Sequence, residues 1–202
     1  MNYKINVNKV DNGTYLRGFA SVEFENSFAV KNIAINEGSN GLYVQFPQYK
    51  TSQVDEDGKA VYKSVAHPIT SEFAKELNEN ILKTYESGEK TMQIGDADSN
   101  NLDFSISNNL VDNGNIKAYT NIYIGEDFVV KNISIIEGSK GLFVSNPSSK
   151  SKKLDDNGKP IYNDIAFPTT ADSRKAIYDA ILDDYKKQTT TKEVEVAKTK
   201  TI

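Results

Sequence analysis

Hydrophobic and polar residues alternate along much of this chain of 202 residues. Such alternation predicts strands with one buried face and one face in water. It is clearest in four segments of the first half, at 3–7, 16–24, 28–35 and 42–46. Between these segments lie Asp, Asn and Gly residues, which tolerate the backbone conformations of tight turns. The first half therefore predicts an antiparallel sheet.

The third of these segments changes phase part-way along. Phe28 and Val30 belong to one face of the predicted strand. Ile33 and Ile35 continue the alternation, but one residue out of phase. A single inserted residue at Lys31-Asn32 accounts for the change, and an inserted residue of this kind is a β-bulge.

The pattern becomes helical after residue 70. Apolar residues between 71 and 87 recur at helical spacing, which predicts a helix with one buried stripe. Thr70 or Ser71 is suited to cap its first turn, and Gly88 is suited to end it. The polar stretch 48–59 before it predicts a long loop. The expected unit is thus a curved antiparallel sheet followed by one helix.

The chain repeats itself with an offset of 100 residues. Segments 28–47 and 128–147 are identical at 13 of 20 positions, and the register continues to Tyr85 and Tyr185. A match of this length indicates an internal duplication. We therefore predict an α+β protein that contains two copies of one unit.

The repeat also sets the expected domain limits: 1–86 for the first domain, 87–101 for a linker, 102–187 for the second domain and 188–202 for a flexible tail. One helix covers only part of a sheet, so a second copy is expected to bury the rest. The linker holds the two copies at high effective concentration. We expect domain 1 to pair with domain 2 as an intramolecular pseudo-dimer.

Composition narrows the function. The chain has no Cys and one His, which argues against disulfides, thiolate chemistry and zinc sites. It has no long apolar segment and no signal-peptide pattern, so we expect a cytoplasmic protein that binds no membrane, metal or cofactor. The net charge is −4 in residues 1–100 and zero in residues 101–202. Phosphate binding is therefore expected in a local patch of the second half.

One motif resembles a known family. It begins at Ile33 as Ile-x-Ile-x-Glu-Gly-x-x-Gly-Leu-Tyr-Val-x-x-Pro and is followed from Ala66 by Ala-His-Pro-Ile-Thr-Ser. This order is similar to the SpoVG family (stage V sporulation protein G, septation regulator). The resemblance implies a small bacterial cytoplasmic protein that dimerises through its sheets, binds DNA or RNA, and influences gene expression, sporulation and septation. It also leaves room for further homo-oligomers.

The resemblance also implies where a nucleic acid would bind. The basic pair that follows Pro in the family aligns with Tyr49-Lys50 and Ser149-Lys150, and a helix Arg aligns with Arg174. The second copy adds further cations nearby. The candidate phosphate contacts are Lys50, Lys150, Lys152, Lys153, Arg174 and Lys175.

Other interpretations of the same residues stay open. A protein-interaction module that has lost its nucleic-acid surface also fits the acidic first half. Catalysis would need His67, but Phe167 occupies the matching position, so a structural role is preferred and no enzyme is expected. The acidic turns at 55–58 and 155–158 lack EF-hand spacing and predict ordinary turns. Glycines at 38 and 41 predict a hairpin loop, because they lie between strands.

Overall fold

The computed structural model describes residues 1–11 and 13–199, without the side chains of Asp112, Lys152 and residues 192–199. The elements of the first half are β1 Tyr3–Lys9, β2 Leu16–Phe24, β3 Phe28–Gly38, β4 Gly41–Gln45, β5 Gln48–Val54, β6 Ala60–Ser64, β7 Ala66–Pro68, α1 Ser71–Ser87 and β8 Thr91–Ile94. Those of the second half are β9 Phe104–Asn113, β10 Ile116–Ile124, β11 Phe128–Gly138, β12 Gly141–Ser145, β13 Ser148–Leu154, β14 Pro160–Asp164, β15 Ala166–Pro168 and α2 Ala171–Thr199. The repeat in the sequence is therefore a repeat in structure, as predicted.

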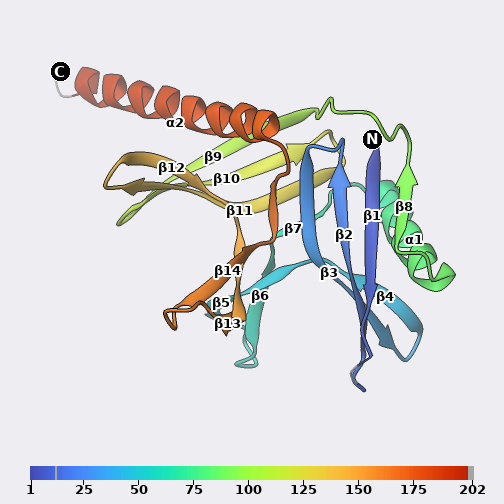
Figure 1. The fold of residues 1–202 in the computed structure, drawn as a ribbon. Coiled ribbons are helices and arrows are strands. Elements are labelled where there is room, and N and C mark those ends of the chain that lie inside the picture. Colours follow the sequence, from blue (N-terminus) through green and yellow to red (C-terminus); the bar gives the residue numbers. More distant parts are fainter. Residues whose placement is uncertain (12, 200–202) are drawn as a thin grey trace.

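Each unit forms a main sheet, and each sheet ends in a strand from the other unit. In the described chain, the first sheet runs β15-β3-β2-β1-β8, with β4 also paired to β3. The second runs β12-β11-β10-β9, with β7 also paired to β11. In Figure 1 the two sheets meet at the centre, where β7 and β15 cross between them. The predicted pseudo-dimer thus takes the form of a reciprocal strand exchange.

The exchanged strands are short but tightly held. Ala66 of β7 lies opposite Val130, and the backbone N–H of Lys131 donates to the carbonyl of Val65 at 2.7 Å. The second unit repeats the arrangement, since Ala166 of β15 lies opposite Val30. All four of these paired aliphatic residues are fully buried. The crossing therefore lies inside the protein core.

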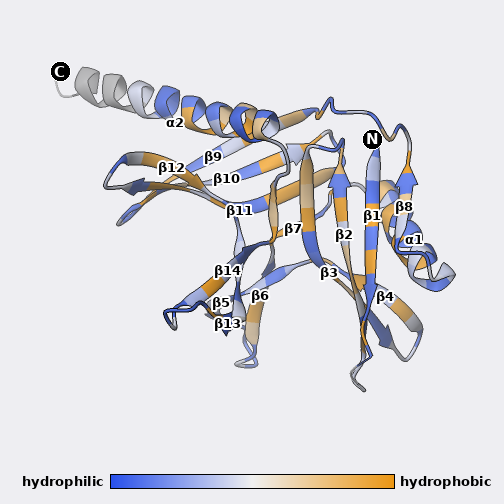
Figure 2. Ribbon diagram, in the orientation of Figure 1, coloured by the Kyte–Doolittle hydropathy of each residue, from blue (hydrophilic) through white to orange (hydrophobic). Residues whose placement is uncertain are grey.

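One hydrophobic core serves both units. Figure 2 shows hydrophobic and hydrophilic residues alternating along β1 to β3, as expected for strands with one buried face. At the centre, the ring of Phe128 lies 4.9 Å from that of Phe24 and 6.0 Å from that of Phe46. Residues of both sheets and both helices belong to the same buried cluster. Neither unit encloses its own core.

The β-bulge predicted from the phase change is confirmed. Along the β2–β3 ladder, Ala20 pairs with Ile33 and Val22 pairs with Val30, so one residue of β2 faces two residues of β3. Asn32 takes the left-handed backbone conformation with φ of 60°, and Asn132 repeats it with φ of 64°. Asn tolerates this conformation better than other residues with a Cβ atom.

The helix prediction is also confirmed. Thr70 caps α1, because its hydroxyl accepts a hydrogen bond from the N–H of Phe73 at 3.3 Å. Gly88 ends α1 with φ of 79°, a conformation that favours glycine. Phe73, Leu77 and Ile81 are buried. In Figure 1 α1 lies beside β1 and α2 lies along β9, and both helices pack on the buried faces of the sheets.

Each helix is joined to its sheet by a polar contact of its own. In the first unit the Tyr3 hydroxyl donates to Glu76 at 2.7 Å and accepts from the Asn80 amide at 2.9 Å. Burial raises the pKa of Tyr3, so the hydroxyl stays protonated. The second unit has Phe104 at the position of Tyr3. Phe104 has no hydroxyl group, so the second helix is joined to its sheet by different residues.

That contact lies deeper in the second sheet. The buried hydroxyl of Thr120 donates to Asn108, whose amide donates to Asp184 of α2 at 2.9 Å. The matching residues of the first unit are Val7 and Ala20, which are apolar. A buried polar group without a partner costs stability. Each helix is consequently matched to its own sheet.

The predicted linker, 87–101, is not structureless throughout. Residues Thr91–Ile94 form β8, which pairs antiparallel with β1. Met92 and Ile94 pack against the core, because alternate residues of this short segment face inward. The prediction missed β8, since four residues carry too little alternation to stand out.

The predicted tail also differs. Helix α2 continues to Thr199, so the segment from 188 onwards is helical up to that residue. Gln188 stands where Gly88 ends α1, and glutamine has no tendency to stop a helix. Residues 200–202 lie outside the described chain. Among the described residues, no helix has both the length and the apolar character that a membrane span requires.

Shortening Phe128 tests the shared core. We expect Phe128→Ala to lower the free energy of unfolding by about 3–5 kcal/mol, because the ring is fully buried and its loss leaves a cavity. We expect one unfolding transition, because the exchanged strands join both sheets. Phe143→Ala is the control, since Phe143 is 48% exposed. Two resolved transitions in a denaturant titration would contradict the shared core.

His67 gives a prediction about pH. Burial, with a smaller contribution from the charge of Lys131, lowers the pKa of His67 below 6.5. Protonation therefore favours the unfolded chain, and the stability present above pH 6.5 is lost as the pH falls through the folded pKa. We expect His67→Phe, which copies Phe167, to lose less thermal stability than the wild type between neutral and acidic pH. Equal losses in a melting series would contradict this role for His67.

Candidate nucleic-acid interface

Two hairpin arms project from the crossing. The first arm pairs β5 with β6, and the second pairs β13 with β14. In Figure 1 both arms lie below the second sheet and beside the lower part of the first. The polar segment from 48 to 59 had been predicted as a loop, and that prediction was wrong for β5. Strands β5 and β13 consist mostly of polar residues, so hydrophobic alternation does not reveal them.

The turns of the arms use their acidic side chains locally. The Asp55 carboxylate accepts hydrogen bonds from the backbone N–H groups of Asp57 at 3.0 Å and Lys59 at 2.8 Å. Asp155 makes the same two contacts in the second arm. These are turn-forming contacts, as the sequence predicted. Within the described chain, no cluster of His, Asp or Glu is arranged to hold a metal ion.

Each arm places a lysine opposite a tyrosine. Lys50 pairs across the strands with Tyr62, and Lys150 pairs with Tyr162. The tyrosines are 57% and 62% exposed, respectively, and both lysines are exposed. Among the described side chains, no carboxylate forms a salt bridge with Lys50, Lys150 or Lys153. The arms therefore present free cations beside exposed aromatic rings.

The arms meet at their bases. The Asn32 amide, at the β-bulge of the first unit, donates to the Ser149 hydroxyl of the second arm at 3.4 Å. Tyr62 of the first arm and Ser149 and Ile165 of the second line one cavity of about 260 Å³. The bulge and the strand exchange thus bring two arms from distant parts of the sequence to one surface.

The six predicted contacts fall into two groups. Lys50, Lys150 and Lys153 lie on the arms, and all three are exposed. Lys152 also belongs to β13, but its side chain lies outside the described residues. Arg174 and Lys175 lie near the start of α2, outside the two arms. The six residues therefore come from two kinds of element, the arms and helix α2.

The two helix cations already have partners. The Arg174 guanidinium donates to the Tyr178 hydroxyl and to the carbonyl of Pro168, both at 3.3 Å. Lys175 forms an ion pair with Asp179 one turn along the helix, and this hydrogen bond raises the pKa of the ammonium group. Arg174 thus helps to hold the start of α2 against β15.

The bulge lysines have contacts of their own. The ammonium group of Lys31 lies 4.8 Å from the centre of the Phe167 ring, on the exchanged strand of the other unit. In the matching place Lys131 approaches His67, whose neighbour Ser64 donates its hydroxyl to the carbonyl of Ala66 instead. These contacts place His67 in the unit interface, with the Ser64 hydroxyl directed at the backbone. A structural role accounts for it.

Tyr62 and Tyr162 were missed as candidate contacts. The sequence drew attention to Tyr49, which is only half-exposed. The repeat could have indicated them, because an identical tyrosine lies among polar residues at the same position of both copies. The sequence alone does not show that these two tyrosines are exposed, because their exposure depends on the hairpin structure of the arms.

Comparison with known proteins identifies the family. The SpoVG family model matches residues 1–87 and 102–187, which together make up most of the chain. The chain belongs to the SpoVG family. Its two SpoVG units correspond to the two structural repeats, with one helix completing each. The segment between them, which contains β8, falls outside both matches.

Individual SpoVG relatives match one unit at a time. The chain is similar to a "putative septation protein SpoVG" of Treponema denticola, with 32% identity over 83 residues, or 41% of this chain and 83% of the relative. A protein of the same name from Onion yellows phytoplasma is 39% identical over 80 residues, covering 40% of this chain and 74% of the relative. A third, from a Thermoanaerobacter strain, is 34% identical over 86 residues, or 43% and 87%. Each relative thus corresponds to about half of this chain.

Proposed function

We propose that this protein is a non-catalytic regulator that binds a strand of DNA or RNA with its two arms. The observation that carries the proposal is the two exposed cross-strand pairs, Lys50 opposite Tyr62 and Lys150 opposite Tyr162. Lysine attracts phosphate and releases its condensed counterions. Tyrosine offers a flat surface on which a base stacks. Both parts of a nucleotide therefore meet a suitable side chain.

The exposed rings favour single-stranded nucleic acid. Bases in a duplex are stacked on one another and are not available to a tyrosine on a protein surface. A flexible strand, in contrast, turns its bases outward while its backbone follows a row of cations. Two arms that meet at their bases give such a strand two successive positions. The septation named in the relatives is the process that we propose such a regulator serves.

The second arm is the stronger of the two in this proposal. It carries four lysines among residues 148–164, whereas the first arm carries three among residues 48–64. Each arm holds three acidic residues, so only the second has a net positive charge. Because the whole chain is acidic, with a net charge of −4, binding depends on this local surface.

Charge reversal on the second arm tests the phosphate contacts. We expect the triple variant Lys150→Glu, Lys152→Glu and Lys153→Glu to lose measurable binding to single-stranded pools. In the wild type, log affinity should fall with log salt, and three phosphate contacts contribute a slope of about 2. The measurement is fluorescence anisotropy at low and high salt. The control reverses Lys83, Lys90 and Lys187, which changes the net charge equally but lies outside the arms.

Removing the rings tests the base contacts. We expect Tyr62→Ala with Tyr162→Ala to weaken binding by about 5- to 150-fold per stacked base, with the salt slope unchanged. Both rings are exposed, so the fold should keep its stability. Wild-type affinity in both the charge variant and the tyrosine variant would refute the arms as the binding site. No binding by the wild type at low salt would instead favour a protein-interaction module.

A further inference from the structure

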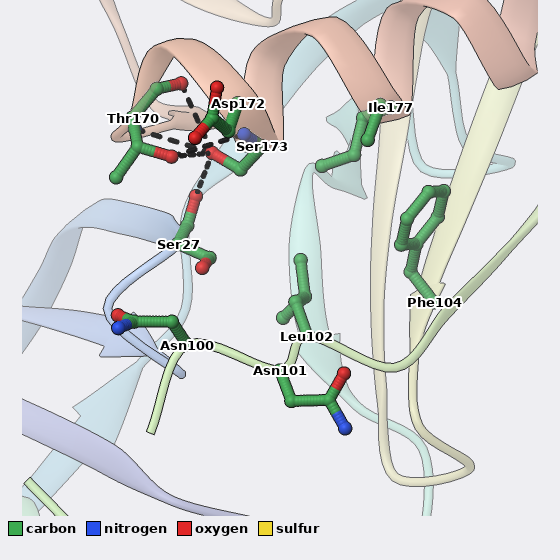
Figure 3. Close-up of a pocket in the computed structure, with 10 residues that line it drawn as sticks. Ser27, Asn100, Asn101, Leu102, Phe104, Thr170, Asp172, Ser173 and Ile177 are labelled. Carbon is green, nitrogen blue, oxygen red and sulfur yellow. Dashed lines mark hydrogen bonds between the residues drawn. The ribbon is translucent and has the colours of Figure 1, made fainter. Parts of the chain in front are cut away.

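A cavity lies in the second unit, beside the start of its helix. It measures about 460 Å³ and lies where the start of α2 meets the start of β9. Figure 3 shows an open space surrounded by Leu102, Phe104 and Ile177 on one side, with the first turn of α2 above it. Asn100 and Asn101, from the segment that joins the units, complete its edge. It lies at the α2 side of the molecule, away from the arms.

The duplication explains why this space is open. In the first unit the Phe73 ring fills the corresponding place, 5.7 Å from the Tyr3 ring and 6.5 Å from the Phe24 ring. The residue of the second unit that matches Phe73 is Ser173, and Ala176 replaces Glu76. Both replacements are smaller. These smaller side chains leave room beside the start of α2, and this room contributes to the cavity.

The cavity offers both apolar contact and hydrogen bonds. Its apolar wall, including the Phe104 ring, suits the face of an aromatic ring. The amides of Asn100 and Asn101 and the carboxylate of Asp172 provide donors and acceptors at the edge. The Ser173 hydroxyl is already engaged, because it donates to the carbonyl of Ser27 at 2.9 Å. The hydroxyl-bearing residues Ser27 and Thr170 also line the cavity, so its polar groups include hydroxyls, amides and a carboxylate.

The volume sets the size of the ligand. A cavity of about 150 Å³ is enough for one benzene ring, and small-molecule sites range over about 300–1,000 Å³. At about 460 Å³, this cavity has room for one or two fused rings with polar substituents. We propose that it is a binding site for a small aromatic molecule with hydrogen-bonding groups on its edge. This proposal goes beyond the nucleic-acid function, because it uses no residue of the arms.

Binding can be measured with simple probes on the full chain. We expect phenol, indole and adenine to bind with dissociation constants on the order of 1 mM, because small fragments gain limited affinity. Ligand-observed NMR detects binding in this range. Adenine represents a free or splayed nucleobase, whereas phenol and indole represent other aromatic metabolites, so their relative affinities distinguish the two sources. Absence of binding by all three would overturn the proposal.

The first unit supplies the matched variants. Ser173→Phe restores the ring found at Phe73, and it should weaken probe binding at least tenfold while the folded state persists in a thermal melt. Ala176→Leu, which narrows the cavity from another position, should weaken binding as well. Conversely, Phe73→Ser should open the twin cavity and raise the number of probe sites from one to two. Unchanged affinity in both filling variants would refute the site.

The arms provide the remaining control. The triple charge variant at Lys150, Lys152 and Lys153 leaves the cavity untouched, so it should bind the aromatic probes like the wild type. Loss of nucleic-acid binding with retained probe binding would separate the two sites. Loss of both in a folded protein would contradict the independence of the cavity.

Discussion

The crossing of β7 and β15 is the constraint on which the rest of the structure depends. Each of these strands has three residues and is buried against a sheet that belongs to the other unit. An arm comes directly before each strand, and a helix begins directly after it. The crossing therefore fixes where both arms leave the core and where both helices start. It also explains why Phe128 meets residues of the first unit at the centre.

The stability of the arms depends on this crossing as well as on the sequence of the arms. A polar hairpin of two short strands has little stability in isolation. Here the strand at the end of each hairpin is held in the core, and the bulge at Asn32 gives the second arm a contact with the first unit. The arms can therefore stay folded although their lysine and tyrosine side chains are exposed and add little to stability.

Periodicity predicted the main strands, the bulge and the helix caps, because each depends on residues close in sequence. The strand exchange could not be predicted in this way. Residues 66–68 are too few for a periodic signal, and their partners lie about 60 residues away. For the candidate interface, sequence located Lys50 and Lys150 but not Tyr62 and Tyr162, whose exposure depends on the arm. It also grouped Arg174 with the arm lysines, but not with the Tyr178 hydroxyl and the Pro168 carbonyl to which Arg174 donates.

The matched polar contacts of the two helices have a consequence for how such a protein can evolve. In a dimer of identical chains, every substitution appears twice and must suit both halves at once. Fusion of two copies in one gene removes that requirement. Val7 in one half and Asn108 in the other, or Phe73 and Ser173, are changes that a single copy could not have made separately. Because both halves belong to one chain, each half can acquire its own substitutions while the two halves stay paired.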